Sequence, residues 1–171
     1  MEVAFSTRRL AIAPLTADDL DEALAVYDSR PEYQALVEGS AGEPGYYDLD
    51  MLQRDWSIAQ ITPERTFAGM RLHERGALVG LLDWLDPNPT DGLPWIGLIL
   101  VARPHERRGY AREAIEALIA HAGWPLVREA VIADNEAGLA LARSLRFEQY
   151  GETERALAGG LRRLLLLERH Q

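Results

Sequence analysis

Residues 95–118, WIGLILVARPHERRGYAREAIEAL, join two contrasting patterns that decide the expected fold. The run from Trp95 to Val101 is apolar almost throughout, which is typical of a central strand covered on both faces. From Gly109 onward the spacing of apolar residues predicts an amphipathic helix that ends near His121. Several arginines crowd the junction. The stretch therefore predicts a buried strand that leads into a helix with a basic start.

The start of this helix has the properties of an anion site. The first backbone N–H groups of a helix have no intrahelical partner, and the helix dipole adds partial positive charge. Gly109 has no Cβ, so a phosphate can approach the backbone closely. Arg107, Arg108 and Arg112 would disfavour a helix start unless an anion offsets their charge. A solvated basic surface is the alternative, but ligands of open α/β sheets bind where such a strand ends.

The rest of the chain surrounds this unit with strands and helices. Caps and periodicity predict helices after Thr16, Asp48 and Asn135, and a short helix with a loop within residues 31–47. The unit from Val101 to Leu126 is expected to be a parallel crossover in a mixed α/β sheet. The other predicted strands are residues 7–15, 65–73, 77–85, 126–133, 147–157 and 161–169.

Composition narrows the class of protein. The 171 residues fit a single domain, covering residues 1–171, and 47% hydrophobic residues suffice for a core. Without Cys or Lys, the chain has no thiolate nucleophile, no lysine Schiff base and no P-loop lysine. The four His residues form no metal-binding spacing, so we expect no metal. A formal net charge of -9 argues against nucleic-acid binding, and the lack of a signal peptide or membrane-spanning run predicts a cytoplasmic location.

Two segments resemble the signatures of the GNAT N-acetyltransferase superfamily. VARPHERRGYAREAIEAL resembles its acyl-CoA motif, with Val101 at the strand end. VIADNEAGLALARSLRF resembles its second signature, with Asn135 after the strand and Phe147 after the helix. DSRPEYQALVEG and LPWIGLILV further resemble a bacterial subgroup of unassigned substrate. The order of predicted elements is similar along nearly the whole chain.

The resemblance implies a fold and a cosubstrate. The fold would be a mixed, mostly antiparallel central sheet flanked by helices, with a central parallel strand pair splayed to hold acyl-CoA. Acetyl-CoA would lie between residues 98–101 and 126–133, and an acceptor amine would attack the thioester directly, with a backbone N–H near Ile99 for the oxyanion and no covalent enzyme intermediate. The implied cofactor-binding residues are Leu100, Val101, Arg107, Arg108, Gly109, Tyr110, Ala111, Arg112 and Asn135.

Three positions depart from the family pattern. Glu106 replaces the usual Gln or Arg, and it could repel phosphate or point to solvent. Arg146 replaces a small residue before Phe147, so that turn could differ. Ala142 stands where a Tyr often protonates the leaving thiolate, and water or another hydroxyl could substitute for it. The missing Tyr leaves a second hypothesis open, a catalytically silent acyl-CoA-binding module. A nucleotide-binding domain is disfavoured, because no glycine-rich phosphate motif is present.

The acceptor side is less defined by the sequence. Asp83 interrupts an apolar strand and is the first candidate for the general base. The alternative is that it faces water near the strand end or bonds a neighbouring loop. Asp86 and Glu38 are weaker candidates. Tyr33, Tyr46 and Trp95 are candidates for the acceptor pocket, with ordinary packing as the alternative. We expect a small-molecule amine or a peptide N-terminus as the acceptor, no membrane partner, and leave a homodimer open.

Overall fold

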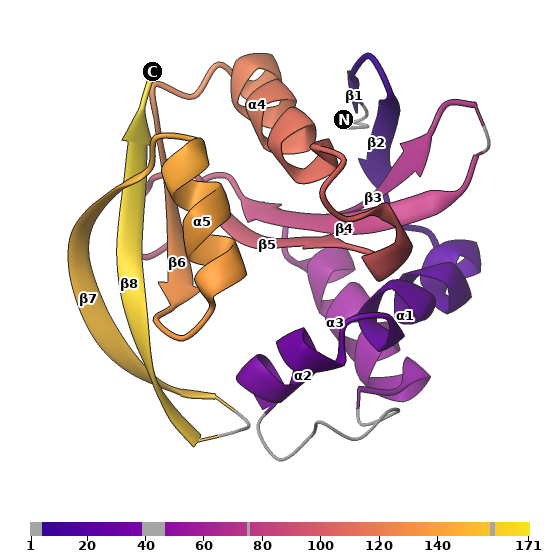
Figure 1. The fold of residues 1–171 in the computed structure, drawn as a ribbon, viewed down its shortest axis with the longest axis horizontal. Coiled ribbons are helices and arrows are strands. Elements are labelled where there is room, and N and C mark those ends of the chain that lie inside the picture. The colour runs from indigo at the N-terminus through magenta and orange to yellow at the C-terminus, as the bar shows by residue number, and fades with distance from the viewer. Residues whose placement is uncertain (1–4, 39–46, 75, 158–159) are drawn as a thin grey trace.

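The computed structural model describes residues 5–38, 47–74, 76–157 and 160–171. These residues form one eight-stranded sheet with the order β1-β2-β3-β4-β5-β6-β8-β7 (Figure 1). Every neighbouring pair is antiparallel except β5 and β6, which are parallel. The strands are β1 (Phe5–Ser6), β2 (Leu10–Pro14), β3 (Arg65–Leu72), β4 (Leu78–Leu85), β5 (Trp95–Val101), β6 (Leu126–Ile132), β7 (Glu148–Leu157) and β8 (Gly160–His170).

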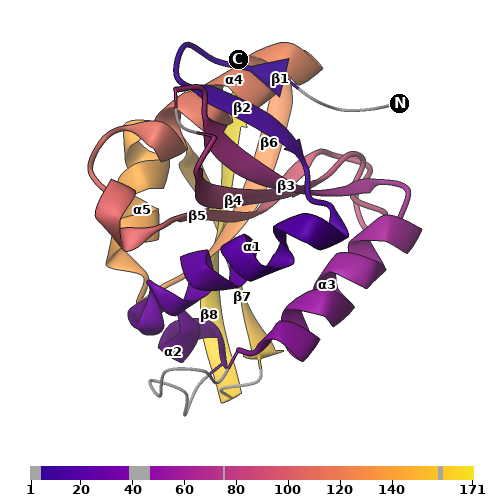
Figure 2. The same cartoon turned by 90° about the vertical axis from the view of Figure 1, so that its right-hand side faces the viewer.

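Helices cover both faces of this sheet. Buried residues of α1 and α3 pack in one cluster, and those of α4 and α5 pack in another. Figures 1 and 2 show the two pairs of helices on opposite sides of the sheet. Among the described residues, none of the helices is long and apolar enough to cross a membrane. The helices are α1 (Leu20–Asp28), α2 (Pro31–Glu38), α3 (Leu49–Ile61), α4 (Tyr110–Ala122) and α5 (Glu136–Ser144), with 3-10 turns at Ala17–Asp19 and Arg103–His105.

The predicted mixed, mostly antiparallel sheet with a central parallel pair is confirmed. The caps also form: Asp48 accepts a hydrogen bond from the Met51 N–H at 2.9 Å, and Asn135 accepts one from the Gly138 N–H at 3.0 Å. The two-residue strand β1 was not predicted from the sequence. Residues 39–46, within which a loop was predicted, lie outside the described part of the chain.

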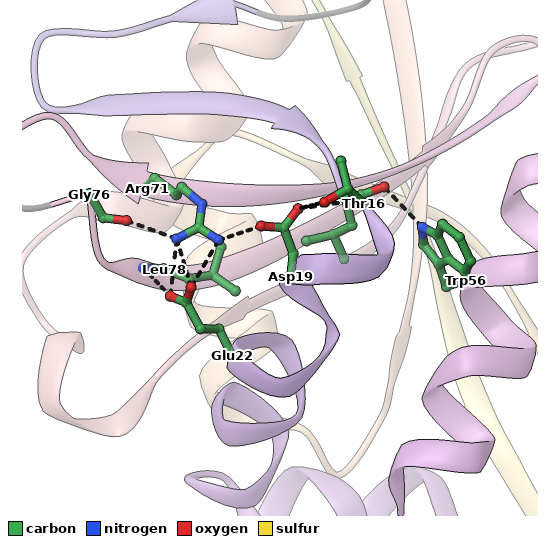
Figure 3. Close-up of polar contacts among 8 residues, drawn as sticks. Thr16, Asp19, Glu22, Trp56, Arg71, Gly76 and Leu78 are labelled. Carbon is green, nitrogen blue, oxygen red and sulfur yellow. Dashed lines mark hydrogen bonds and ion pairs between the residues drawn. The ribbon is translucent and has the colours of Figure 1, made fainter.

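A polar cluster fastens α1 to the sheet (Figure 3). Asp19 Oδ2 accepts from both the backbone N–H and the hydroxyl of Thr16 at 2.7 Å, while Asp19 Oδ1 lies 2.5 Å from Arg71 Nη2. Arg71, on β3, also reaches Glu22 at 3.0 Å. The Trp56 indole, from α3, donates to the Leu15 carbonyl at 2.9 Å. These contacts therefore fix the positions of α1 and α3 relative to β2 and β3.

The two parallel strands separate soon after they meet. Strand β5 pairs with β6 only at Trp95–Arg128 and Ile96–Glu129. On its other edge, Ile96 faces Trp84 and Leu98 faces Asp83, so Gly97 is an extra residue that forms a bulge. A bulge bends the strand that carries it and increases its twist. The bend at Gly97 therefore coincides with the point at which β5 leaves β6.

Candidate active site

A cleft of about 900 Å³ occupies the space between the diverging strands β5 and β6. Its walls also include the start of α4, one side of α5 and part of α2. The apolar run of β5 was expected to be covered on both faces, but Leu98 and Ile99 are only half-buried because they line this cleft. Clefts of this size hold small-molecule ligands and cofactors.

The edge of β5 that faces the cleft directs backbone groups toward it. The Ala102 N–H donates to the Val79 carbonyl at 2.9 Å, toward the neighbouring strand β4. Since successive residues of a strand direct their backbone groups to alternate edges, Ile99 and Val101 direct theirs to the opposite edge, where β6 has diverged. A ligand in the cleft can therefore pair with the backbone of β5 as a strand would.

The loop at the far end of β5 has a conformation suited to an anion. Gly109, the N-cap of α4, has a φ of 80°, and Arg107 has a φ of 59°. Left-handed residues within a turn make successive N–H groups converge on a concavity that binds anions. Gly109 is needed here because other residues reach this conformation only with strain. Backbone, charge and helix dipole thus point to one anion site.

Most of the predicted cofactor-binding residues line the cleft. Arg108 does not, because the loop turns it outward, and its carbonyl accepts a hydrogen bond from Arg9 Nη1 at 2.9 Å. Arg112 lines the cleft but also donates to the Ser144 carbonyl at 2.7 Å, which ties α4 to the end of α5. The predicted residues that line the cleft are Leu100, Val101, Arg107, Gly109, Tyr110, Ala111, Arg112 and Asn135.

Arg9 supports the helix start from behind, a role that the sequence analysis did not predict. Its guanidinium lies 4.6 Å from the centre of the Tyr110 ring, and its Nε lies 2.6 Å from Glu113 Oε2. Burial opposes ionisation of Glu113, but hydrogen bonds from Thr7 and Arg9 outweigh this and lower its pKa. Arg9 lies about a hundred residues before the loop it supports, so no local pattern could indicate the contact.

Arg30 is a second residue that the sequence analysis missed. It follows α1, its side chain is largely buried, and its Nη1 donates to the Val101 carbonyl at 2.9 Å. The same nitrogen lies 2.9 Å from Glu106 Oε1. Neither expectation for Glu106 describes its environment fully. Its carboxylate lies beside the cleft, where Arg30 neutralises its charge.

The end of α5 shows how the other two departures are accommodated. Arg146 adopts a φ of 64°, so the turn before Phe147 keeps a left-handed residue although it is not a glycine. Ala142 is 2% exposed and belongs to the core cluster, whereas Ser144 lines the cleft. The Ser144 hydroxyl donates to the Leu141 carbonyl at 2.7 Å. Ala142 therefore cannot supply the proton donor that the family's Tyr often provides at this position.

Glu129 is a buried acid at the closed end of the cleft. It faces Ile96 at the last paired position of β5 and β6, and it is 8% exposed. Its Oε1 has no hydrogen-bond partner within the part of the chain that the structure describes. Burial raises the pKa of Glu129 to about 7. Glu129 shares the buried face of β6 with Val127 and Val131, two residues before and after it. This period-two pattern could have identified it from the sequence.

A side pocket of about 340 Å³ adjoins the cleft and contains Asp83. Asp83 is 6% exposed, and Arg65 binds both of its oxygens, with Nη2 at 2.7 Å from Oδ2. Burial raises the pKa of Asp83, and Arg65 opposes the rise. Tyr33, Gly97 and Leu98 line both cavities, so the pocket and the cleft adjoin at the bulge in β5.

The predicted acceptor-side residues are distributed over both cavities. Tyr33 lines both of them, and Trp95 lines the cleft while its indole donates to Asp91 Oδ2 at 2.9 Å. Tyr46 lies outside the described residues. Asp86 accepts from the Trp124 indole at 2.7 Å, so this weaker candidate has a structural partner. Within the described ranges, no group of three or more His, Asp or Glu residues could hold a metal ion.

The fold agrees with comparisons to known proteins. No curated protein matches the chain. An acetyltransferase from Thermus thermophilus has a TM-score of 0.76 at 23% identity, over 98% of this chain and 100% of that one. The ribosomal-protein-S5-alanine acetyltransferase from Vibrio fischeri has a TM-score of 0.72 at 12% identity, over 98% and 96%. The Microcin C7 self immunity acetyltransferase MccE, in complex with acetyl-CoA and AMP, has a TM-score of 0.78 at 11% identity, over 96% and 93%.

These structural similarities agree in fold, and the sequence itself identifies the family. The family model described as an acetyltransferase (GNAT) domain matches residues 9–148. This range contains the diverging strands, the arginine-rich loop and the Asn135 cap. The chain belongs to the GNAT acetyltransferase family.

Proposed function

We propose that the protein is an acetyl-CoA-dependent N-acetyltransferase that moves the acetyl group to a primary amine by direct attack. One observation carries the proposal: the cleft that opens at Gly97 borders the side pocket of Asp83 and reaches the start of α4. A thioester in this cleft would have an acceptor on one side and an anion site at its far end. Among the structural neighbours, MccE was crystallised with acetyl-CoA, which supports the choice of acyl donor.

The residues of the cleft fit such a donor. The Val101 N–H and the Ile99 carbonyl on this edge of β5 can pair with the amides of the pantetheine arm, and the loop from Arg107 to Arg112 can hold the diphosphate. The Ile99 N–H would also stabilise the oxyanion that forms when the amine attacks, a contact of a kind worth about 3 kcal/mol. The protein's part is therefore to position the thioester and stabilise developing charge.

Two carboxyl groups can carry out the two proton transfers of the reaction. The amine nitrogen bonds to the acetyl carbon, the carbon–sulfur bond breaks, and the nitrogen loses a proton. Asp83, ionised beside Arg65, would accept that proton from the acceptor side. Glu129, with a pKa of about 7, is partly protonated near neutrality and would give a proton to the leaving thiolate. This assignment supplies the acid that is missing at Ala142.

Thiol release tests the proposal. Acetyl-CoA and a panel of primary amines should release coenzyme A only when an amine is present, and the product should carry an acetyl group on nitrogen by mass spectrometry. If coenzyme A binds and no amine supports release, the catalytically silent acyl-CoA-binding module is the better description. If coenzyme A does not bind at all, both hypotheses fail.

A further inference from the structure

The side pocket beside the cleft has a chemical character of its own. Its volume of about 340 Å³ is suited to a small ligand about the size of one amino acid. It combines aromatic rings, a buried ion pair and one amide. The lining residues that give it this character include Tyr27, Gln34, Tyr47, Arg65, Phe67 and Asp83.

Gln34 is the residue in this pocket whose hydrogen bonding is incomplete. It is 3% exposed, and its Nε2 has no hydrogen-bond partner among the residues that the structure describes. A buried N–H group without an acceptor is unfavourable, so an oxygen supplied by a ligand would stabilise it. Gln34 lies on α2 beside Tyr33, which lines both cavities. An oxygen bound by Gln34 would therefore belong to a molecule near the cleft.

The charges around the pocket limit what that oxygen can be. Asp55 and Asp83 face one cation, Arg65, and both oxygens of Asp83 are already bound by it. The hydroxyl of Tyr47 donates to Asp55. The remaining excess of negative charge attracts an ammonium group and repels a carboxylate. A neutral oxygen, from a hydroxyl or an amide, satisfies Gln34 without this repulsion.

The aromatic walls favour an apolar group on the same molecule. The rings of Tyr27 and Tyr47 lie 4.5 Å apart, and Phe67 is 3% exposed in the same cluster of buried residues. Burial raises the pKa of Tyr27, so its hydroxyl stays neutral and adds no further charge. An aromatic or aliphatic substituent can pack against these rings.

We propose that the side pocket selects primary amines that carry a neutral, hydrogen-bond-accepting oxygen close to the amine, and that Gln34 donates to this oxygen. The inference rests on the proposed function, because it describes the acceptor of that reaction. Simple polyamines, which lack an oxygen, and amino acids with a free carboxylate are poor ligands on this basis. Amino alcohols and amino amides are the preferred class.

Binding of four matched amines tests this selection without turnover. Phenylalaninol, phenylalaninamide, phenylalanine and phenethylamine share the ring and the amine but differ in the oxygen. Calorimetric titration should give about tenfold tighter binding for the alcohol or the amide than for phenethylamine, with phenylalanine the weakest. The ranking of alcohol against amide then identifies which oxygen the pocket prefers.

Variants of Gln34 locate the effect. Gln34→Met keeps the length of the side chain and should reduce the alcohol and amide to the affinity of phenethylamine, whose own affinity should not change. Gln60→Met, at an exposed position on α3, is the matched control and should leave all four affinities unchanged. If Gln34→Met does not fold, Gln34→Leu carries the test, because it removes the donor without adding a charge that would attract the ammonium group.

The selection is overturned if phenethylamine binds as tightly as the oxygen-bearing amines, if Gln34→Met weakens all four equally, or if none of them binds. Because these titrations require no acetyl transfer, an absence of thiol release contradicts the proposed function and leaves the binding result intact.

Discussion

Gly97 lies against the carboxylate of Asp83, since a Cβ at position 97 would lie 3.5 Å from Asp83 Oδ1. A larger side chain at this bulge would therefore fill the space between the two cavities. The backbone of Gly97 does not require glycine, because its φ lies outside the left-handed region. Glycine at position 97 therefore leaves space between the two cavities. It is not required by the backbone conformation.

Gly97→Val should accordingly impair the acceptor and spare the cosubstrate. We expect KM for the amine to rise about 10- to 100-fold, because displacement of the acceptor by even about 1 Å is costly. Coenzyme A affinity should change little. Gly151→Val is the control: a Cβ there also meets its nearest neighbour at 3.5 Å, but Gly151 lies in β7 outside both cavities. Equal effects of the two variants on KM would contradict the assignment of this space.

Glu129 should make stability depend on pH. Its pKa of about 7 in the folded chain lies above the ordinary 4.5, so protonation favours the folded state. This contribution is full below pH 4.5 and is lost as the pH rises through 7. Between about pH 5 and pH 8, wild type should lose about 2 kcal/mol of unfolding free energy relative to Glu129→Gln. Urea denaturation at both pH values measures this, and parallel losses in the two proteins would refute it.

The same residue should shape the pH profile of the reaction. If Glu129 protonates the thiolate, kcat of wild type falls as the pH rises above about 7, since the acid is then ionised. Glu129→Gln should lower kcat by about 100-fold and remove this limb of the profile. Unchanged coenzyme A affinity would show that the cleft is intact. A variant that keeps the alkaline limb would assign it to another group.

Arg30 should protect the anion site from Glu106. Arg30→Met leaves the Glu106 carboxylate unpaired beside the cleft, so coenzyme A affinity should fall about tenfold through repulsion of the diphosphate. Adding Glu106→Gln removes the charge and should restore most of the affinity, although Arg30 remains absent. Calorimetric titration of the single and double variants measures this. Failure of the second change to restore binding would mean that Arg30 acts through its other contacts, the Val101 carbonyl or Glu32.

Local sequence patterns were sufficient to predict most helices and strands and the anion-binding end of the site. The apolar run of β5, the cap at Asn135 and the glycine at position 109 each depend on neighbours in sequence, and each was predicted. The contacts of Arg9 and Arg30 join segments separated by 71 to 104 residues, so only the folded sheet brings them to the loop. Tertiary placement cannot be obtained from periodicity alone.

The divergence of β5 and β6 was expected from family resemblance, but its local cause was not. The bulge at Gly97 becomes visible only from the register with β4, because a glycine within an apolar run has several explanations. Asp83 was identified because a charge interrupts its strand. Its binding by Arg65 and the incomplete hydrogen bonding of Gln34 depend on side chains from different elements that meet in the pocket.

Coenzyme A titration of two glycine variants tests the anion site most directly. Gly109 and Gly123 cap the two ends of α4, with φ values of 80° and 68°. Alanine at either position introduces strain of about 1–2 kcal/mol, so both variants should lose similar stability. Calorimetry should show that Gly109→Ala weakens coenzyme A binding about tenfold or more while Gly123→Ala binds like wild type. Equal affinity in all three proteins would contradict the placement of the diphosphate at the start of α4.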